Sequence, residues 1–591
     1  MKRILFFSLW VALCGACTSD KSLGDSDTGI SQPSWTAEVY SRSEGQTHLF
    51  SFVADGAWEA SGSEAWCTVA PRTGDAGWQF IDVATAANAS GVSRTAVVTV
   101  QVKGRPTAAS FRVVQYAEGG EYVEVNEWVA KYMRDYYLWN EPIPGLKLDY
   151  ASSYDAFLAS ILQGVAAVED AEGRALNYDD GHWKNGRREY FYSYISKTQR
   201  SANGATRSAG ERVSGTGVWR ARAVELVRGT IGFVIEGVTP GTSAAAAGLE
   251  RGMFISEVDG QAVTETNYKT LALRLYDGAS VRVAPNRVVW GVDGGFRRLE
   301  PLPEATLVSQ NYIDPAIYKS VVTIVGGKRT AYLLYMGFET AEDESLIAAF
   351  RDFKGVEELI VDLRYNGGGA VRSSTLLATL ILGEAYKDAV YCRMTYNARR
   401  AALGESGVYR IGESRVPDGT GTYTPIASAL SSGLGLKRIY VLCSENTASA
   451  SELVINGLRG LDIEVRLIGS RTNGKNVGME GYVDHVVDGE LYTFMPITFY
   501  SENAVGFRDY SDGFVPDIEV AEGPFYEQVY YPGEFGTSAD PLYALAVEWI
   551  AQGQKPAATR AAAGFRTVRE LPGITERPDS RLKGAIVFRE R

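Results

Sequence analysis

The spacing of apolar and polar residues changes several times along the chain. Between about residues 35 and 115, short runs such as 48–53 and 95–102 alternate apolar with polar positions, and Gly, Asn and Ser separate the runs. Period-two alternation broken by turn residues is typical of strands with one buried face. We therefore expect an all-β, immunoglobulin-like sandwich over residues 33–118.

A helical period follows. Val125, Trp128, Val129, Tyr132 and Met133 recur at helical spacing, and a second apolar stretch with the same period covers 154–168. These stretches predict a small helical region over residues 120–200. Further on, between about 300 and 552, apolar runs such as 358–363, 439–443 and 465–468 each lead into a loop of small residues. Buried strands that alternate with helical segments predict an α/β core.

Composition limits the class of protein. With 591 residues, the chain is too long for a single hydrophobic core, so we expect a multidomain protein. The net charge of −12 and the lack of a Lys/Arg cluster disfavour nucleic acid as a partner. The sequence has no metal-binding motif and no phosphate-binding loop, so we expect neither a metal nor a cofactor.

The N-terminus has the pattern of an export signal. Lys2 and Arg3 precede an apolar run at 4–13 that is too short to span a bilayer. The segment 13–17 (LCGAC) resembles a bacterial lipobox, which implies a signal peptide at 1–17, lipidation of Cys17 and a tether at 18–32. The expected location is the cell envelope, anchored by lipid to the outer membrane and facing the periplasm or the cell surface. Secretion without an anchor is the alternative.

Two segments resemble known binding modules. One segment resembles BACON domains, which leaves open a glycan or surface contact, although tryptophans of a sandwich usually fill its core; the resemblance lies in the order of Trp58, Trp66, Gly74, Asn88, Arg94 and Gln115. Separately, the segment 212–290 contains Gly215-Thr216-Gly217-Val218 followed by 238–249 and 252–260, an order that resembles a bacterial PDZ domain. That resemblance implies capture of a peptide by strand addition, with the Gly215–Val218 amides facing its carboxylate. A turn and hairpin without a ligand is the alternative.

Three loops of the predicted core carry the candidate chemistry. The run 358–363 ends in Asn366-Gly367-Gly368-Gly369, whose backbone N–H groups are able to face an anion. The strand 439–443 leads through small residues to Ser449 at the start of a helix, where a serine is either a nucleophile or an ordinary N-cap. The strand 465–468 leads to a glycine-bounded loop with Lys475. A buried lysine loses its charge easily, so it would be able to accept the serine proton.

Together these segments resemble the carboxy-terminal processing peptidases, also called tail-specific proteases. The resemblance covers about residues 126–550, including 513–517 and 540–542. It implies a Ser-Lys peptidase core at 300–552, with Ser449 as nucleophile and Lys475 as general base. It also implies an oxyanion hole formed by the amides of Ala450 and of Gly367 or Gly368.

One position departs from the family pattern. Many members have a Gln four residues after the lysine, and here that residue is Met479, which leaves Asn476 or Glu480 as neighbours that could orient the amine. We therefore expect a serine endopeptidase that acts on peptides or proteins. The alternative is a weak or inactive peptidase-like lipoprotein that binds peptides. The segment 553–591 is expected to be a poorly ordered tail.

Overall fold

The computed structural model describes residues 28–31, 33, 35, 38–41, 43–90, 93–116, 122–171, 173–184, 187–199, 212–291, 295–413, 415–417, 423–425, 427–481, 483–487, 490–520, 528–556 and 567–571. The predicted signal peptide, Cys17 and most of the tether lie outside these residues. Contacts divide the chain into two compact units, one of 1–128 with 148–157 and the other of 129–147 with 158–591. No helix within the described ranges has the length and apolar character needed to cross a bilayer.

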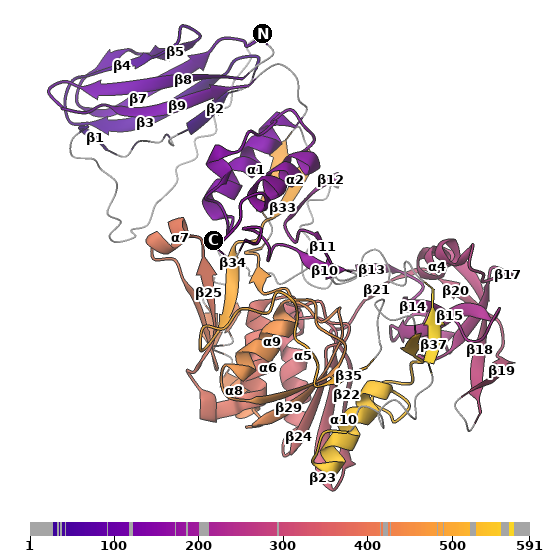
Figure 1. Ribbon diagram of the computed structural model, residues 1–591. Coiled ribbons are helices and arrows are strands. Elements are labelled where there is room, and N and C mark those ends of the chain that lie inside the picture. Colours follow the sequence, from indigo (N-terminus) through magenta and orange to yellow (C-terminus); the bar gives the residue numbers. More distant parts are fainter. Residues whose placement is uncertain are drawn as a thin grey trace, which may run out of the picture. The chain divides into compact units, whose positions relative to one another are not determined.

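The N-terminal segment forms two β-sheets with a common core (Figure 1). The alternation seen in the sequence is the cause, because Phe50, Phe52, Val98 and Val100 all point into that core. One sheet has the order β1 (Ile30–Ser31), β3 (Thr47–Ala54), β7 (Gly77–Thr85), β5 (Cys67–Ala70). The other has the order β2 (Glu38–Ser41), β9 (Ala109–Gln115), β8 (Arg94–Val102), β4 (Trp58–Gly62), β6 (Thr73–Gly74).

The helical region is shorter than we expected. It contains α1 (Val123–Tyr136), the 3-10 turn η1 (Ile143–Gly145) and α2 (Tyr154–Ala166). After these helices the chain forms the hairpin β10 (His182–Lys184) and β11 (Arg187–Tyr190), then β12 (Tyr194–Gln199). The prediction of a helical region up to residue 200 is therefore wrong for its last part, because β12 pairs with a distant strand, β33.

Residues 212–313 form a unit that we call the middle β unit, which extends beyond the predicted boundary at 290. Three neighbouring strands of its sheet run from β14 through β15 to β16. Its elements are β13 (Arg212–Gly215), β14 (Val218–Glu225), β15 (Ile231–Val238), α3 (Ser243–Ala246), β16 (Phe254–Val258), β17 (Gln261–Ala262), α4 (Tyr268–Asp277), β18 (Ser280–Trp290), β19 (Phe296–Pro301), β20 (Ala305–Val308) and β21 (Gln310–Ile313).

The α/β core is built on a six-stranded sheet. Its order is β22 (Ile317–Val325), β23 (Lys328–Tyr335), β24 (Glu358–Asp362), β29 (Arg438–Cys443), β30 (Glu464–Gly469), β35 (Ile518–Glu519), and the strands from β23 onward are parallel. Alternate residues of these strands belong to two different apolar clusters. One cluster includes α5 (Asp343–Asp352), α6 (Val371–Leu382) and α9 (Ala450–Arg459), and the other includes α10 (Pro541–Gln552), so helices cover both faces (Figure 1).

Smaller sheets and short helices complete the core. Two of these sheets have the orders β12-β33-β32 and β26-β25-β34-β31. The remaining elements are η2 (Thr340–Glu342), η3 (Gly383–Tyr386), β25 (Val390–Tyr396), α7 (Ala398–Ala402), β26 (Gly407–Arg410), β27 (Arg415–Pro417), β28 (Tyr423–Pro425), α8 (Ala427–Ser431), β31 (Val477–Gly478), β32 (Val483–Val487), β33 (Glu490–Met495) and β34 (Phe499–Asn503).

Part of the predicted tail is an ordered strand. β37 (Thr567–Glu570) lies between β14 of the middle β unit and β36 (Gln528–Tyr530), and it is antiparallel to both. The expectation of a poorly ordered tail is therefore wrong for 567–571, because this stretch completes a sheet begun more than 300 residues earlier.

Candidate active site

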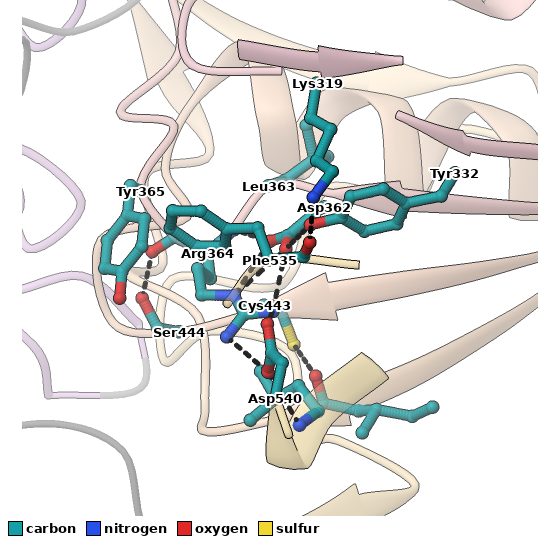
Figure 2. Close-up of polar contacts among 12 residues, drawn as sticks. Lys319, Tyr332, Asp362, Leu363, Arg364, Tyr365, Cys443, Ser444, Phe535 and Asp540 are labelled. Carbon is teal, nitrogen blue, oxygen red and sulfur yellow. Dashed lines mark hydrogen bonds and ion pairs between the residues drawn. The ribbon is translucent and has the colours of Figure 1, made fainter. Parts of the chain in front are cut away.

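A buried arginine supports the glycine loop. Arg364 lies between two carboxylates, donating to Asp362 through Nε and Nη2 at 2.9 and 2.7 Å and to Asp540 through Nη1 and Nη2 at 3.0 and 2.8 Å (Figure 2). The Tyr332 hydroxyl also donates to Asp362 at 2.8 Å. Since all three charged groups are fully buried, these bonds hold the end of β24 against the start of α10.

The backbone of Ser449 is strained. Ser449 directly precedes α9 and has φ 58° and ψ −112°. An L-residue with a side chain rarely adopts this conformation, which costs on the order of 1–3 kcal/mol and occurs mostly at functional sites. An ordinary N-cap serine has extended backbone angles. Ser449 does hold the N-cap position of α9 and forms a capping box with Glu452, but its positive φ is not that of an ordinary cap, so capping alone does not explain its conformation.

The glycine loop lies directly against this serine. A Cβ atom on Gly368 would come within 2.9 Å of the Ser449 Cβ and 3.0 Å of the Ala450 nitrogen. Asn366 fixes the approach, because its carbonyl oxygen accepts from the Ala448 N–H at 3.2 Å and from the Ser451 hydroxyl at 2.9 Å. The positive φ of Gly368 and this close packing explain why glycine is required at that position.

The predicted oxyanion amides differ in their availability. The Gly368 N–H donates to Asn366 Oδ1 at 2.9 Å, so it is already used within the loop. Among the residues that the structure describes, no acceptor pairs with the N–H of Ala450 or of Gly367. Of the two glycines that the sequence left open, Gly367 is therefore the better candidate for the second donor.

One carboxylate connects Ser449 with Lys475. Glu452 Oε2 accepts from the Ser449 N–H at 3.0 Å and from the Lys475 N–H at 2.8 Å. Two bonds to one oxygen place these backbone nitrogens within about 6 Å of each other. Glu452 Oε1 accepts from the Gly474 N–H at 2.6 Å and from the Thr472 hydroxyl at 2.7 Å. Burial raises the pKa of Glu452 to about 7, although its four hydrogen bonds act in the opposite direction.

Lys475 lies in an environment that favours its neutral form. The residue is 3% exposed, as is Ser449, and the Lys475 Nζ lies 4.6 Å from the centre of the Tyr192 ring. Burial lowers the pKa of Lys475 to about 8, while the charges of Asp180 and Glu452 partly oppose this shift. A lysine with this pKa is partly deprotonated near neutral pH, which is what a general base requires.

Asp180 and Tyr192 were missed in the sequence. Asp180 is fully buried and accepts from the Tyr192 and Ser193 N–H groups, both at 2.8 Å, from the Ser193 hydroxyl at 2.6 Å and from the Tyr137 hydroxyl at 2.8 Å. Burial raises its pKa to about 6. The Tyr192 hydroxyl donates to Asn473 Oδ1 at 2.7 Å, next to the Lys475 loop. The paired aspartates at 179–180 were the only available signal.

The residues proposed to replace the missing Gln have other partners. Glu480 pairs with Arg400, with Oε1 at 3.0 Å from Nη2, and the Asn476 side chain donates to the Arg508 carbonyl at 3.0 Å. Glu480 is therefore not favoured as the group that orients the Lys475 amine, whereas Asn476 stays open, because its Oδ1 is buried without a partner among the described residues; Met479 is buried as well. The groups that surround the amine are instead Tyr192 and the carboxylates of Asp180 and Glu452.

The Gly215–Val218 loop uses most of its amides internally. The Thr216 N–H donates to the Tyr276 carbonyl at the end of α4 at 3.1 Å, and the Val218 N–H donates to the Thr216 hydroxyl at 3.3 Å. Gly217 has φ 97°, and its N–H has no acceptor among the described residues. A set of several free amides that converge on a carboxylate is therefore not present in this loop.

Other candidate sites are limited. Within the described ranges, no group of three or more His, Cys, Asp or Glu side chains is arranged to hold a metal ion. A cavity of about 650 Å³ lies in the middle β unit, lined by residues such as Leu249, Met253 and Arg287, away from Ser449 and Lys475. The chemistry of the three core loops, rather than this cavity, identifies the candidate active site.

The comparisons with known proteins agree with this location. The model of peptidase family S41 matches residues 329–520, and that of the peptidase S41 N-terminal domain matches 124–194. These two segments are therefore similar to domains of peptidase family S41. The S41 match includes all three loops of the candidate site, and S41 is a family of serine peptidases. A model described as a viral BACON domain matches residues 30–116. No curated protein matches the sequence.

One solved structure supports the same fold. An S41 protease from Bacteroides fragilis NCTC 9343 aligns with a TM-score of 0.56 and 23% identity over 72% of this chain and 98% of that protein. A photosystem II D1 C-terminal processing protease aligns with a TM-score of 0.36 and 18% identity over 68% of this chain and 93% of that protein. The first alignment supports the fold, and the site rests on the geometry described above.

The tryptophans of the N-terminal domain fall into two groups. Trp58 is buried in the core, and the Arg94 guanidinium lies 4.4 Å from the centre of the Trp66 ring. Trp78 and Phe80 on β7 are 58% and 57% exposed. The core interpretation of Trp58 is therefore confirmed by its burial, whereas the sequence pattern does not indicate the exposed aromatic pair.

Proposed function

We propose that this protein is a serine endopeptidase in which Ser449 is the nucleophile and Lys475 the general base. The observation that carries the proposal is the Glu452 carboxylate, which accepts hydrogen bonds from the backbones of a strained serine and a buried lysine on adjacent loops. A capping box accounts for the bond between the Ser449 N–H and Glu452, but it accounts neither for the positive φ of Ser449 nor for the burial of Lys475.

The chemistry follows from the positions of these groups. The Ser449 hydroxyl attacks a peptide carbonyl and transfers its proton to the neutral Lys475 amine. The negative charge that develops on the carbonyl oxygen is stabilised by the N–H groups of Ala450 and Gly367 and by the N-terminus of α9. The amine then protonates the leaving nitrogen, and a water molecule, activated by the same amine, releases the acyl product.

A matched pair of serine variants tests this function. Ser449→Ala is expected to lower the cleavage of an unfolded protein such as casein by at least about 10³-fold, with unchanged circular dichroism. Ser451→Ala, which removes only a hydroxyl bonded to the Asn366 carbonyl, should retain most of the activity. Cleavage by the Ser449 variant at the wild-type rate would remove Ser449 from the mechanism.

The second candidate is a peptide-binding protein without turnover. The observation that favours it is Met479 at the position of the usual Gln, together with the burial of Ser449. This candidate predicts that bound peptides are recovered intact by mass spectrometry after prolonged incubation, whereas the peptidase predicts cleavage products that depend on Ser449.

Three further parts of the function remain proposals. A PDZ-like role of the middle β unit is supported by its order of elements, and the occupied amides of Thr216 and Val218 favour recognition of an extended strand over capture of a carboxylate. The lipid anchor at Cys17, at the outer membrane, is supported by the sequence alone. A contact of the N-terminal domain with glycans or a surface is supported by the exposed Trp78 and Phe80.

A further inference from the structure

The edge of β14 is occupied by a distant part of the same chain. β37 pairs with β14 in antiparallel register, with Glu570 opposite Val224 and Arg569 opposite Glu225. The Leu571 N–H continues the ladder by donating to the Ala223 carbonyl at 2.9 Å. This edge of β14 is where a sheet takes up an added strand, so 567–571 has the position of a bound peptide.

The side chains of this segment enter two different apolar environments. Val568 is buried on one face of the sheet, in a cluster with Val224, Phe254 and Tyr531. Leu571 is buried in the cluster that contains the α4 residues Tyr268, Leu271 and Leu275. Because side chains of a strand alternate between the faces, Arg569 shares the face of Leu571, beside α4.

A pair of carboxylates receives the basic residue. Arg569 Nε lies 2.7 Å from Glu225 Oε2, and its Nη2 lies 2.7 Å from Glu265 Oε1. The pKa of Glu225 is lowered first by the Gly229 N–H, which donates to Oε1 at 2.7 Å, and then by Arg569, while the two carboxylates raise the pKa of Arg569. The pair is partly exposed, so it adds selectivity for a cation more than it adds affinity.

We propose that the edge of β14, with the Leu571 site beside α4 and the Glu225–Glu265 pair, binds extended polypeptides with a basic residue two positions before an apolar one, and that 567–571 occupies this site in cis. Foreign peptides must therefore displace 567–571 from β14. The inference deepens the proposed peptidase by naming the substrate feature that its middle β unit recognises, but the binding step does not depend on catalysis.

The test is peptide binding in the Ser449→Ala background, in which cleavage is removed. The probe is a fluorescent peptide with the sequence TVREL, measured by anisotropy against the full chain and against a chain that ends at residue 566. The shortened chain is expected to bind the probe at least tenfold more tightly than the full chain. Equal, weak binding by a shortened chain that is folded by circular dichroism would overturn the proposal.

A charge exchange distinguishes this site from nonspecific binding. Replacing the arginine of the probe by glutamate should weaken its binding to the shortened chain about tenfold, and Glu225→Arg together with Glu265→Arg should restore it. A glutamate probe that binds as well as TVREL to the unmodified shortened chain would remove the carboxylate pair from the proposal. The matched control is Glu300→Arg, on the exposed strand β19, which should restore nothing.

If the shortened chain fails to fold, a full chain that is cut after folding tests the same proposal. A thrombin site inserted between Pro556 and Thr567 allows the folded protein to be cut afterwards, with 567–571 still in place. An excess of TVREL should release the C-terminal fragment, as seen by size-exclusion chromatography. A fragment that is not released by a hundredfold excess over the protein would overturn the proposal and make β37 a permanent strand. Loss of binding and loss of peptidase activity are separate outcomes, because these measurements require no turnover.

Discussion

Two buried clusters of charged groups lie at the same edge of the core sheet, and they differ in how their charges are paired. Around Arg364, each carboxylate oxygen of Asp540 and of Asp362 accepts from the guanidinium. Around Lys475, the opposite charges of Asp180 and Glu452 are bound mainly to hydroxyl and backbone N–H groups, and the amine lies over an aromatic ring.

The difference is the one expected between a cluster that stabilises the fold and the chemical role that we propose for Lys475. A guanidinium that is bonded on both sides holds its charge and fixes two distant segments. In the second cluster, burial lowers the pKa of Lys475 to about 8 and raises those of Glu452 and Asp180 to about 7 and about 6. Groups that titrate near neutral pH in a buried position are suited to proton transfer.

The largest effect is expected when the structural cluster loses its cation. Arg364→Met leaves Asp362 and Asp540 buried without their partner, which should lower the free energy of unfolding by about 3–5 kcal/mol in urea titrations. The control is Arg298→Met, whose ion pair with Glu300 is exposed and should contribute less than about 1 kcal/mol. Equal effects of the two substitutions would contradict the structural role of Arg364.

Removal of the lysine should change how stability depends on pH. Because the folded pKa of Lys475 is lowered, the unfolded state binds more protons between about pH 8 and 10.5, so this residue makes the protein more stable as the pH rises through that window. Between pH 7 and 10 the wild type should gain on the order of 2 kcal/mol in free energy of unfolding relative to Lys475→Met. Urea titrations at both pH values test this. If the stabilities of the two proteins changed in parallel with pH, the pKa of Lys475 would not be shifted in the folded state.

Glu452→Gln should disturb both stability and catalysis. An amide nitrogen cannot accept the hydrogen bonds that one carboxylate oxygen now receives, and such a mismatch costs about 1–3 kcal/mol. Since Ser449 and Lys475 are both held by this group, kcat/KM should fall about 10²-fold. Glu300→Gln is the surface control. Full activity of Glu452→Gln would show that the carboxylate does not position the two residues.

The smallest effect is expected from Asp180→Asn. The amide keeps a similar shape and can donate to the hydroxyls of Ser193 and Tyr137, but it removes a negative charge that raises the pKa of Lys475. The pKa of Lys475 should therefore fall, and the rising limb of the pH profile of kcat/KM should move to lower pH. Asp179→Asn should leave that limb in place, and an unmoved profile in both variants would exclude an electrostatic effect of Asp180 on the lysine.

The central part of the site was predictable because the chain order determines it. Ser449 and Lys475 follow β29 and β30, which are adjacent parallel strands, so their loops lie at one edge of the sheet. The glycine loop follows β24, the neighbour of β29. The same argument predicts the α/β core. It does not identify which glycine N–H is free to face an oxyanion, because the Asn366 side chain decides this by accepting from the Gly368 N–H.

The remaining features depend on contacts between distant segments. Asp180 and Tyr192 precede Lys475 by nearly 300 residues, and no local pattern links them to it. The strand at Thr567–Glu570 is short and rich in charge, so it has too few alternating positions to be distinguished from a loop. This segment forms a strand because it pairs with β14, and its local sequence gives no sign of that pairing.

Labelling by a fluorophosphonate probe as a function of pH tests the central claim most directly, namely that a buried Lys475 activates Ser449. The account predicts labelling whose rate increases about tenfold per pH unit below pH 8 and then levels off, and that is lost in both Ser449→Ala and Lys475→Met. Labelling that is independent of pH in this range, or that persists in Lys475→Met, would contradict it.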